Sequence, residues 1–220
     1  HMNAKMLGQI NHPGPISFLV WQAEPHPIDK MINALEVELT DHGKIEAYTL
    51  GQTLARFCPI DIFHSPVPRC RQTAEGIYNG IQSIDTRANV SGYLMELGGP
   101  YITGDWNSIA AAIEQLGHNK FLRKWFDNEL PSSLIMPLPK AAHIQINILV
   151  TQLTSSTLSS VNITHDWNIM ILREHYFNLR HEDIGDPDFL DGIYATLSDE
   201  KISLRYHEHE IKIPLSELSA

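Results

Sequence analysis

Four apolar runs in this chain, each about as long as a β-strand, end in polar and chemically reactive residues. They lie within residues 16–25, 61–69, 93–99 and 161–168. The stretches between them carry apolar residues at the spacing of an amphipathic helix, as in residues 47–57. Because strands that alternate with helices are typical of a parallel sheet, this order favours an α/β architecture.

The whole chain is expected to form one domain. We predict a three-layer sandwich with a mainly parallel central sheet, helices on both faces and a small antiparallel C-terminal extension over residues 192–215, where polar and apolar residues alternate. A length of 220 residues suits a single domain over residues 1–220. The pattern in residues 98–139 is less regular, and we expect a lid insertion there, over the strand ends.

Local signals predict where the main helices begin and end. Thr40 is expected to cap the helix that contains Ala47 and Leu54, and Asp166 is expected to cap the helix that follows the last core strand. A strand is expected over residues 90–95. Other helices are expected near residues 69–81, 109–116, 121–126 and 140–153.

Composition narrows the class of protein. The formal net charge is -10, from 16 Lys and Arg against 26 Asp and Glu, which disfavours a nucleic-acid partner because a polyanion binds a basic face. Cys58 and Cys70 are too few for a disulfide framework and fit a reducing compartment. We see no signal-like segment and no apolar run long enough to cross a membrane, so a cytoplasmic protein without membrane contact is expected.

The polar segments are expected to meet in one pocket. In open parallel sheets, ligands bind beyond the carboxyl ends of the strands, and all four reactive segments lie at such ends. The second of them continues into S-P-V-P-R-C-R-Q-T-A-E, from Ser65 to Glu75. The first reads L-V-W-Q-A-E, from Leu19 to Glu24.

These segments resemble those of the histidine phosphatase (phosphoglycerate-mutase-like) superfamily. That family has S-P-L-x-R-x-x-Q-T-A-E in the second segment and L-V-R-H-G-E or L-V-R-H-A-E in the first. The resemblance covers roughly the whole chain and is clearest over residues 16–99 and 161–193. It implies a site in which two arginines hold a phosphoryl group, one histidine accepts it, a second histidine stabilises it and a carboxylic acid protonates the leaving oxygen.

Most positions of that site have a counterpart here. By resemblance, Arg69 is the retained phosphate arginine, His165 is the second histidine and Glu96 is the acid. Asp166, directly after His165, is similar to the acid of the family branch in which a His-Asp pair donates the proton.

The first segment departs from the family, since Trp21 and Gln22 stand where the arginine and the nucleophilic histidine should be. The amide of Gln22 has no basic nitrogen and cannot carry a phosphoryl group, and Trp21 removes a positive charge. His26 lies four residues after Gln22, and His64 lies at the end of the second predicted strand, where the family usually has Ser. Either could reach the pocket as a ligand-binding group or as a substitute nucleophile. A surface or hydrogen-bonding role is the commoner fate of such histidines.

Three hypotheses follow from this pattern. In the first, the pocket is repurposed for acid/base chemistry on a small anionic substrate through Arg69, His165, Glu96 and Asp166, while Trp21 and Gln22 contribute stacking and an amide hydrogen bond. In the second, the chain is a non-catalytic pseudophosphatase that binds a ligand or a partner protein. In the third, it is a phosphatase with a displaced nucleophile.

Neither a cofactor nor a metal is predicted. The acidic residues from Asp186 to Asp191 lack the spacing and the closing Glu of a calcium loop. His207 and His209 share one face of a predicted strand, but two ligands do not make a metal site.

The orientation of Trp21 separates the first two hypotheses: a ring stacked on Arg69 would close the pocket, and a ring turned away would leave it open. We favour the open pocket, because polar groups buried under a sealing ring would need partners.

Overall fold

The chain folds around one mixed β-sheet. The computed structural model describes residues 2, 4–28 and 33–218. Within these residues the sheet has seven strands in the order β3-β2-β4-β1-β5-β6-β7. The strands are β1 (Ser17–Trp21), β2 (Ile60–His64), β3 (Ala88–Tyr93), β4 (Ser159–Thr164), β5 (Gly192–Ser198), β6 (Lys201–Tyr206) and β7 (His209–Pro214).

The sheet has a parallel half and an antiparallel half. Strands β3, β2, β4 and β1 pair in parallel, with Phe18 opposite Val161 and Ile62 opposite the same residue from the other side. Strands β5, β6 and β7 continue the sheet in antiparallel pairs. The predicted α/β fold, with its parallel core strands and antiparallel C-terminal extension, is therefore confirmed.

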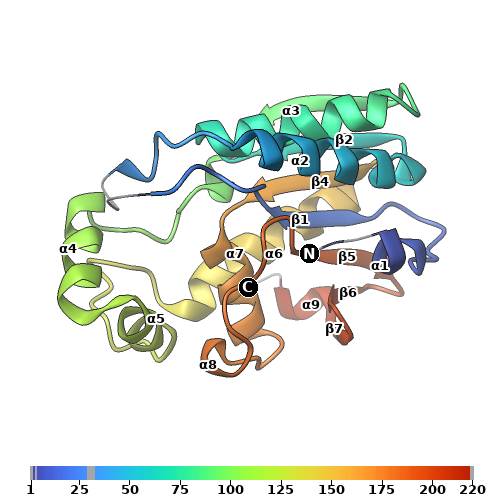
Figure 1. Cartoon of the computed structure of the whole chain (residues 1–220). Helices are drawn as coiled ribbons and strands as arrows, with labels where there is room; N and C mark the ends of the chain where they lie inside the picture. The colour runs from blue at the N-terminus through green and yellow to red at the C-terminus, as the bar shows by residue number, and fades with distance from the viewer. Residues whose placement is uncertain (1, 3, 29–32, 219–220) are drawn as a thin grey trace.

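Helices cover both faces of the sheet (Figure 1). Besides the short 3-10 turns η2 (Ala55–Phe57) and η3 (Met95–Leu97), the helices are α1 (Ala4–Gly8), α2 (Asp41–Leu54), α3 (Pro68–Gln82), α4 (Trp106–Leu116), α5 (His118–Phe126), α6 (Leu138–Ser155), α7 (Asp166–His175), α8 (His181–Ile184) and α9 (Leu215–Leu218). Helices α2 and α3 share one core with the sheet, and α6 and α7 share the other.

The alternation of side chains along β1 shows how one strand serves both cores. Phe18 and Val20 point into the core beneath α2 and α3, whereas Leu19 between them points into the core beneath α6 and α7. All three are fully buried. A continuous apolar run is therefore what a strand covered on both faces requires.

Most predicted element boundaries agree with the structure to within a few residues. The Thr40 cap is confirmed, since its hydroxyl oxygen accepts a 2.9 Å hydrogen bond from the Gly43 amide. Two local predictions are wrong. His165, not Asp166, occupies the cap position of α7, and Asp166 is the first helical residue. The strand expected over residues 90–95 ends at Tyr93, because the chain turns into a 3-10 helix at Met95.

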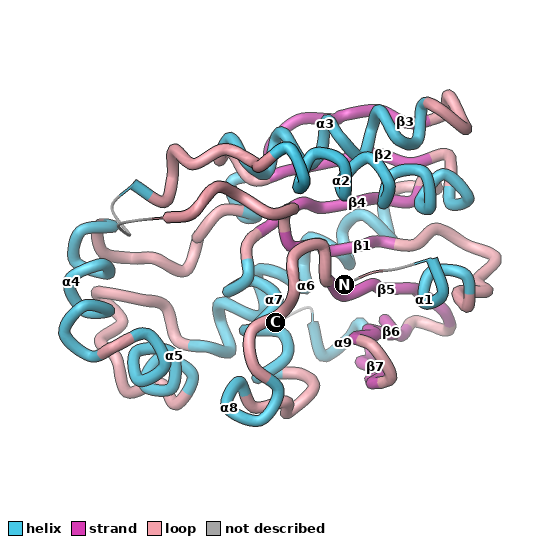
Figure 2. The backbone as a smooth tube through the Cα atoms, in the orientation of Figure 1, coloured by secondary structure: helices cyan, strands magenta, loops and turns pink. Residues whose placement is uncertain are grey.

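Residues 98–139 build α4 and α5, which lie beyond the carboxyl ends of the parallel strands (Figures 1 and 2). Their apolar side chains form a separate core with α7, in which Tyr101, Phe121, Trp125 and Trp167 gather. The role of this segment as a lid stays a prediction. In the described ranges, no helix combines the length and apolarity needed to span a bilayer.

Candidate functional site

A cavity of about 770 Å³ lies at the carboxyl ends of the parallel strands. Its lining comes from the loop after β1, the start of α3, the segment from Met95 to Ile102, the start of α7 and residues of α4 and α5. The predicted pocket residues Trp21, Gln22, Arg69, Glu96, His165 and Asp166 all line it. Parallel strands whose ends share one edge of the sheet bring these distant segments together.

Arg69 is a buried cation at this cavity. It sits in the first turn of α3, directly after Pro68, and is only 7% exposed. One terminal nitrogen donates to the carbonyl of Ala34, the other lies 3.2 Å from His165 Nδ1, and Nε has no partner. Burial lowers the pKa of the guanidinium, although Cys70 and the carboxylate of Asp166 oppose this. Among the described residues no carboxylate forms an ion pair with Arg69, and Asp166 acts on it only through its charge.

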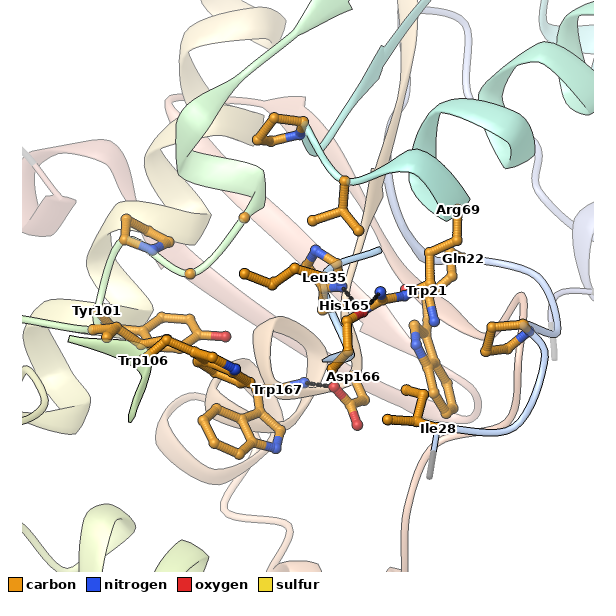
Figure 3. A pocket seen from close by; sticks show the side chains of 18 of the residues that line it. Trp21, Gln22, Ile28, Leu35, Arg69, Tyr101, Trp106, His165, Asp166 and Trp167 are labelled. Atoms are coloured by element: carbon orange, nitrogen blue, oxygen red, sulfur yellow. Dashed lines mark hydrogen bonds between the residues drawn. The ribbon is translucent and has the colours of Figure 1, made fainter. Parts of the chain in front are cut away.

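His165 is held by two hydrogen bonds that define its tautomer (Figure 3). Because the guanidinium of Arg69 only donates, Nδ1 of the ring accepts; the proton therefore lies on Nε2, which donates to Ser65 Oγ at 2.8 Å. Burial first, and then the charge of Arg69, lower the pKa of His165 to about 3. At neutral pH the ring is neutral, and both of its nitrogens are already engaged.

Two carboxyl groups line the same cavity. Asp166 Oδ1 accepts a 2.8 Å hydrogen bond from the Trp167 amide, and burial raises the pKa of Asp166 despite the opposing effects of that bond and of His118 and Arg69. A carboxyl group with a raised pKa keeps its proton to higher pH and can donate it. Glu96 is exposed at the cavity edge, where Gln145 donates a 2.7 Å hydrogen bond to its carbonyl oxygen.

Gln22 is buried at the cavity and makes one side-chain contact. It is 3% exposed, its backbone N–H donates to the Thr164 carbonyl at 3.0 Å, and its side-chain Oε1 accepts from Cys70 Sγ at 3.7 Å. The same thiol lies 3.8 Å from His165 Nε2. Burial raises the pKa of Cys70 to about 12, so it stays a thiol and does not act as a nucleophile at neutral pH.

The ring of Trp21 lines the cavity without stacking on Arg69. It packs against Phe189, with ring centroids 4.5 Å apart and planes inclined by 42°. In the described part of the chain, the cation–π contacts involve other arginines and not Arg69. Trp21 therefore forms a wall beside Arg69 and leaves the cavity open, as Figure 3 shows.

The structure does not bring His26 or His64 to the cavity lining. The His64 ring is buried, and its Nδ1 lies 2.7 Å from the Ser65 carbonyl oxygen. His26 is exposed, and its backbone amide donates to Glu38. Each therefore has the surface or hydrogen-bonding role that is common for histidine.

Several residues that line the cavity or contact its lining escaped the sequence analysis. Ser65 and Cys70 lie inside the motif that carries Arg69, so closer attention to that motif could have found them. The aromatic lining could not be found this way, because Tyr101, Trp106 and Phe189 come from separate segments that carry no shared motif. Within the described ranges, no three His, Cys, Asp or Glu side chains gather as a metal site would require.

Comparison with known proteins agrees with this geometry. The histidine phosphatase superfamily (branch 1) matches the sequence over residues 21–184. No curated protein sequence matches the chain.

Solved structures share the fold at low identity. A mycobacterial glucosyl-3-phosphoglycerate phosphatase is 15% identical, with a TM-score of 0.60 over 83% of this chain and 90% of its own. A mutant phosphoserine phosphatase from Entamoeba histolytica, in complex with phosphoserine, is 14% identical, with a TM-score of 0.56 over 90% of this chain and 94% of its own. Bacillus stearothermophilus YhfR is 13% identical, with a TM-score of 0.59 over 88% of this chain and 96% of its own. The family match spans well over half of the chain, including β2, β3, β4 and every described cavity-lining residue except Phe189, and this chain therefore belongs to the histidine phosphatase superfamily.

Proposed function

We propose that this chain binds a small anionic molecule at Arg69 and carries out no phosphohistidine chemistry. The buried guanidinium is the observation that carries the proposal. A charge removed from water is costly unless an opposite charge compensates it, and among the described residues no carboxylate forms an ion pair with Arg69. Asp166 acts on Arg69 only through its charge, and burial favours the neutral form of that carboxyl group. An anion in the open cavity that Arg69 lines would supply that compensation.

The first strand end argues against covalent phosphoryl transfer. By the sequence resemblance, Gln22 stands at the position of the family's nucleophile. Its backbone N–H donates to the Thr164 carbonyl, and its side-chain Oε1 accepts from the Cys70 thiol. An amide cannot form a stable phosphoryl adduct, and the nearby thiol of Cys70 keeps its proton. His26 and His64 do not line the cavity, which weakens the hypothesis of a displaced nucleophile.

Within this proposal, Asp166 is the group suited to acid/base chemistry. Its raised pKa and its place in the cavity lining fit a proton donor. The alternative is a pseudophosphatase that only binds its ligand. The engagement of His165 favours that alternative, since neither ring nitrogen is free to move a proton. Once a ligand is known, Asp166→Asn should abolish turnover in an enzyme and leave a pure binder's affinity nearly unchanged.

The binding proposal is tested with a panel of small organic acids, both carboxylates and phosphate esters, titrated by calorimetry. We expect binders whose affinity falls about thirtyfold or more in Arg69→Gln, because a charge-assisted hydrogen bond contributes about 2 kcal/mol. Arg71→Gln is the matched control, since Arg71 lies on the same helix with its side chain 59% exposed and pairs with Glu75. Binders that are indifferent to Arg69 would refute the proposal.

The second part is tested with p-nitrophenyl phosphate and an acid-labile phosphate assay. We expect neither turnover nor a phosphoenzyme, because Gln22 cannot accept the phosphoryl group. Turnover that disappears in His26→Ala or His64→Ala would instead support a displaced nucleophile.

A further inference from the structure

The walls of the cavity are aromatic on two sides. Trp21 packs on Phe189 along one side, and Tyr101, Trp106 and Trp167 stand on the other, with Asp166 between the two groups (Figure 3). Three of the chain's four tryptophans therefore line a single cavity. Aromatic rings contribute large apolar contact areas and prefer to pack against other flat rings.

The wall formed by Tyr101 and Trp167 is supported from behind. Trp167 stacks on Phe121, with centroids 5.7 Å apart and planes inclined by 26°, and is only 6% exposed. The Tyr101 ring lies 4.9 Å from that of Trp125 and is 2% exposed. Because these rings belong to the buried core of α4, α5 and α7, their positions are set before any ligand binds.

The charged groups among the described lining residues favour a ligand with a single negative charge. Arg69 is the one arginine or lysine among them, and the neutral ring of His165 adds no charge. Glu96 and Asp166 line the same space, and His118, which acts electrostatically on Asp166, lines it too. A phosphate ester carries close to two negative charges at neutral pH, so one of them would be left facing these carboxyl groups. A carboxylate carries one charge, which Arg69 alone can compensate.

We infer that the ligand of this cavity is an aromatic carboxylic acid, bound as its monoanion with the carboxylate at Arg69 and the ring between the two aromatic walls. This inference rests on the proposed anion-binding function and names the chemical class that the site takes. It sets the chain apart from the phosphate chemistry that its family resemblance implies.

The test compares 2-naphthoate with 2-naphthyl phosphate, the uncharged 2-naphthamide, acetate and inorganic phosphate, each titrated into the full chain by calorimetry. We expect 2-naphthoate to bind at least tenfold more tightly than every other probe. Arg69→Gln should abolish its advantage over the amide, and Trp106→Leu should weaken it at least fivefold. Arg71→Gln should leave all affinities unchanged. Circular dichroism confirms that each variant is folded.

Each contrary result overturns a defined part of the inference. If 2-naphthyl phosphate binds as tightly as 2-naphthoate and both need Arg69, the carboxylate class is wrong while the anion site stands. If acetate binds as well as 2-naphthoate, or if no naphthyl compound binds, the aromatic body is wrong, and the organic-acid panel still tests the anion site independently. If 2-naphthamide binds as tightly as 2-naphthoate and Arg69→Gln changes neither, the inference and the proposed function both fail.

Discussion

The chemical state of His165 is decided by its neighbours. The sequence motif places a histidine at the end of β4, and the family resemblance suggests that it stabilises a phosphoryl group. In the folded chain, Arg69 and Ser65 take up both ring nitrogens, and burial holds the ring neutral. A neutral, doubly hydrogen-bonded imidazole positions Arg69 and adds no positive charge to an anion site.

This burial predicts an acid-sensitive fold. The pKa of His165 in the folded chain, about 3, lies below its ordinary value of 6.5. Between these values the unfolded chain binds a proton that the folded chain does not. The contribution of His165 to the free energy of unfolding is therefore fully present above about pH 6.5, and it is lost as the pH drops towards 3.

Thermal or urea unfolding measured from pH 7 to pH 4 checks this expectation. In His165→Gln, residue 165 cannot titrate. The free energy of unfolding should therefore fall less steeply with decreasing pH, by up to the slope that corresponds to one bound proton. His42→Gln is the control, because the His42 side chain is 67% exposed. An identical pH dependence in His165→Gln and the unmodified chain would show that His165 is not buried as a neutral ring.

Helix α3 owes its position to unusually close packing on α2. Gly51 on α2 and Gly80 on α3 allow the two backbones to touch: a Cβ at Gly80 would collide with the Tyr48 carbonyl oxygen, and one at Gly51 with that of Ile77. Pro68 begins α3, and Arg69 follows at once. This glycine contact therefore helps to position Arg69 at the cavity.

Adding one methyl group at this contact should be costly. We expect Gly80→Ala to destabilise the chain by about 1–3 kcal/mol, since backbone cannot move aside as a flexible side chain can. Gly8→Ala is the control, because its new Cβ would meet only Arg56 Nη1, at an ordinary distance of 3.8 Å. Urea unfolding of both variants measures the difference, and an unchanged Gly80→Ala would mean that α2 and α3 lie farther apart than described.

At the scale of the whole molecule, strand order creates the site. Strands β2, β4 and β1 are neighbours in the sheet although long segments separate them in sequence. Their carboxyl ends bring Ser65, His165 and Gln22 to one edge. By the sequence resemblance, this edge corresponds to the family's phosphate site, and Trp21 at the end of β1 and Gln22 directly after it are where we expect the chain to depart from it.

Restoring the first segment therefore tests the alignment of the whole site. Trp21→Arg together with Gln22→His should bind inorganic phosphate measurably by calorimetry, because a second positive charge and the family's histidine return. Each single variant should fail to do so, since residues of one site act non-additively. A double variant that folds but never binds phosphate would mean that Arg69 and His165 are not aligned as the family has them.

The α/β class, the run of elements and the family resemblance could all be predicted from the chain, because apolar periodicity and the motif around Arg69 are local patterns. The sequence also predicted that the polar residues at the strand ends meet, since the ends of parallel strands share an edge of the sheet. These residues all line the cavity: Trp21, Gln22, Arg69, Glu96, His165 and Asp166. His26, placed near the pocket by its distance from Gln22, and His64, placed there by its position at the end of β2, are not among the described lining residues.

Only the tertiary structure decided that the Trp21 ring packs on Phe189, that His165 is neutral and that Arg69 is buried without a described ion-pair partner. Periodicity states which face of an element is buried, but not which distant side chains meet there. The pKa of a group depends on the water and charges that packing removes or brings near, and an aromatic wall depends on residues far apart in the chain. Both are properties of the assembled molecule, so the sequence alone specified the site's location and the fold specified its chemistry.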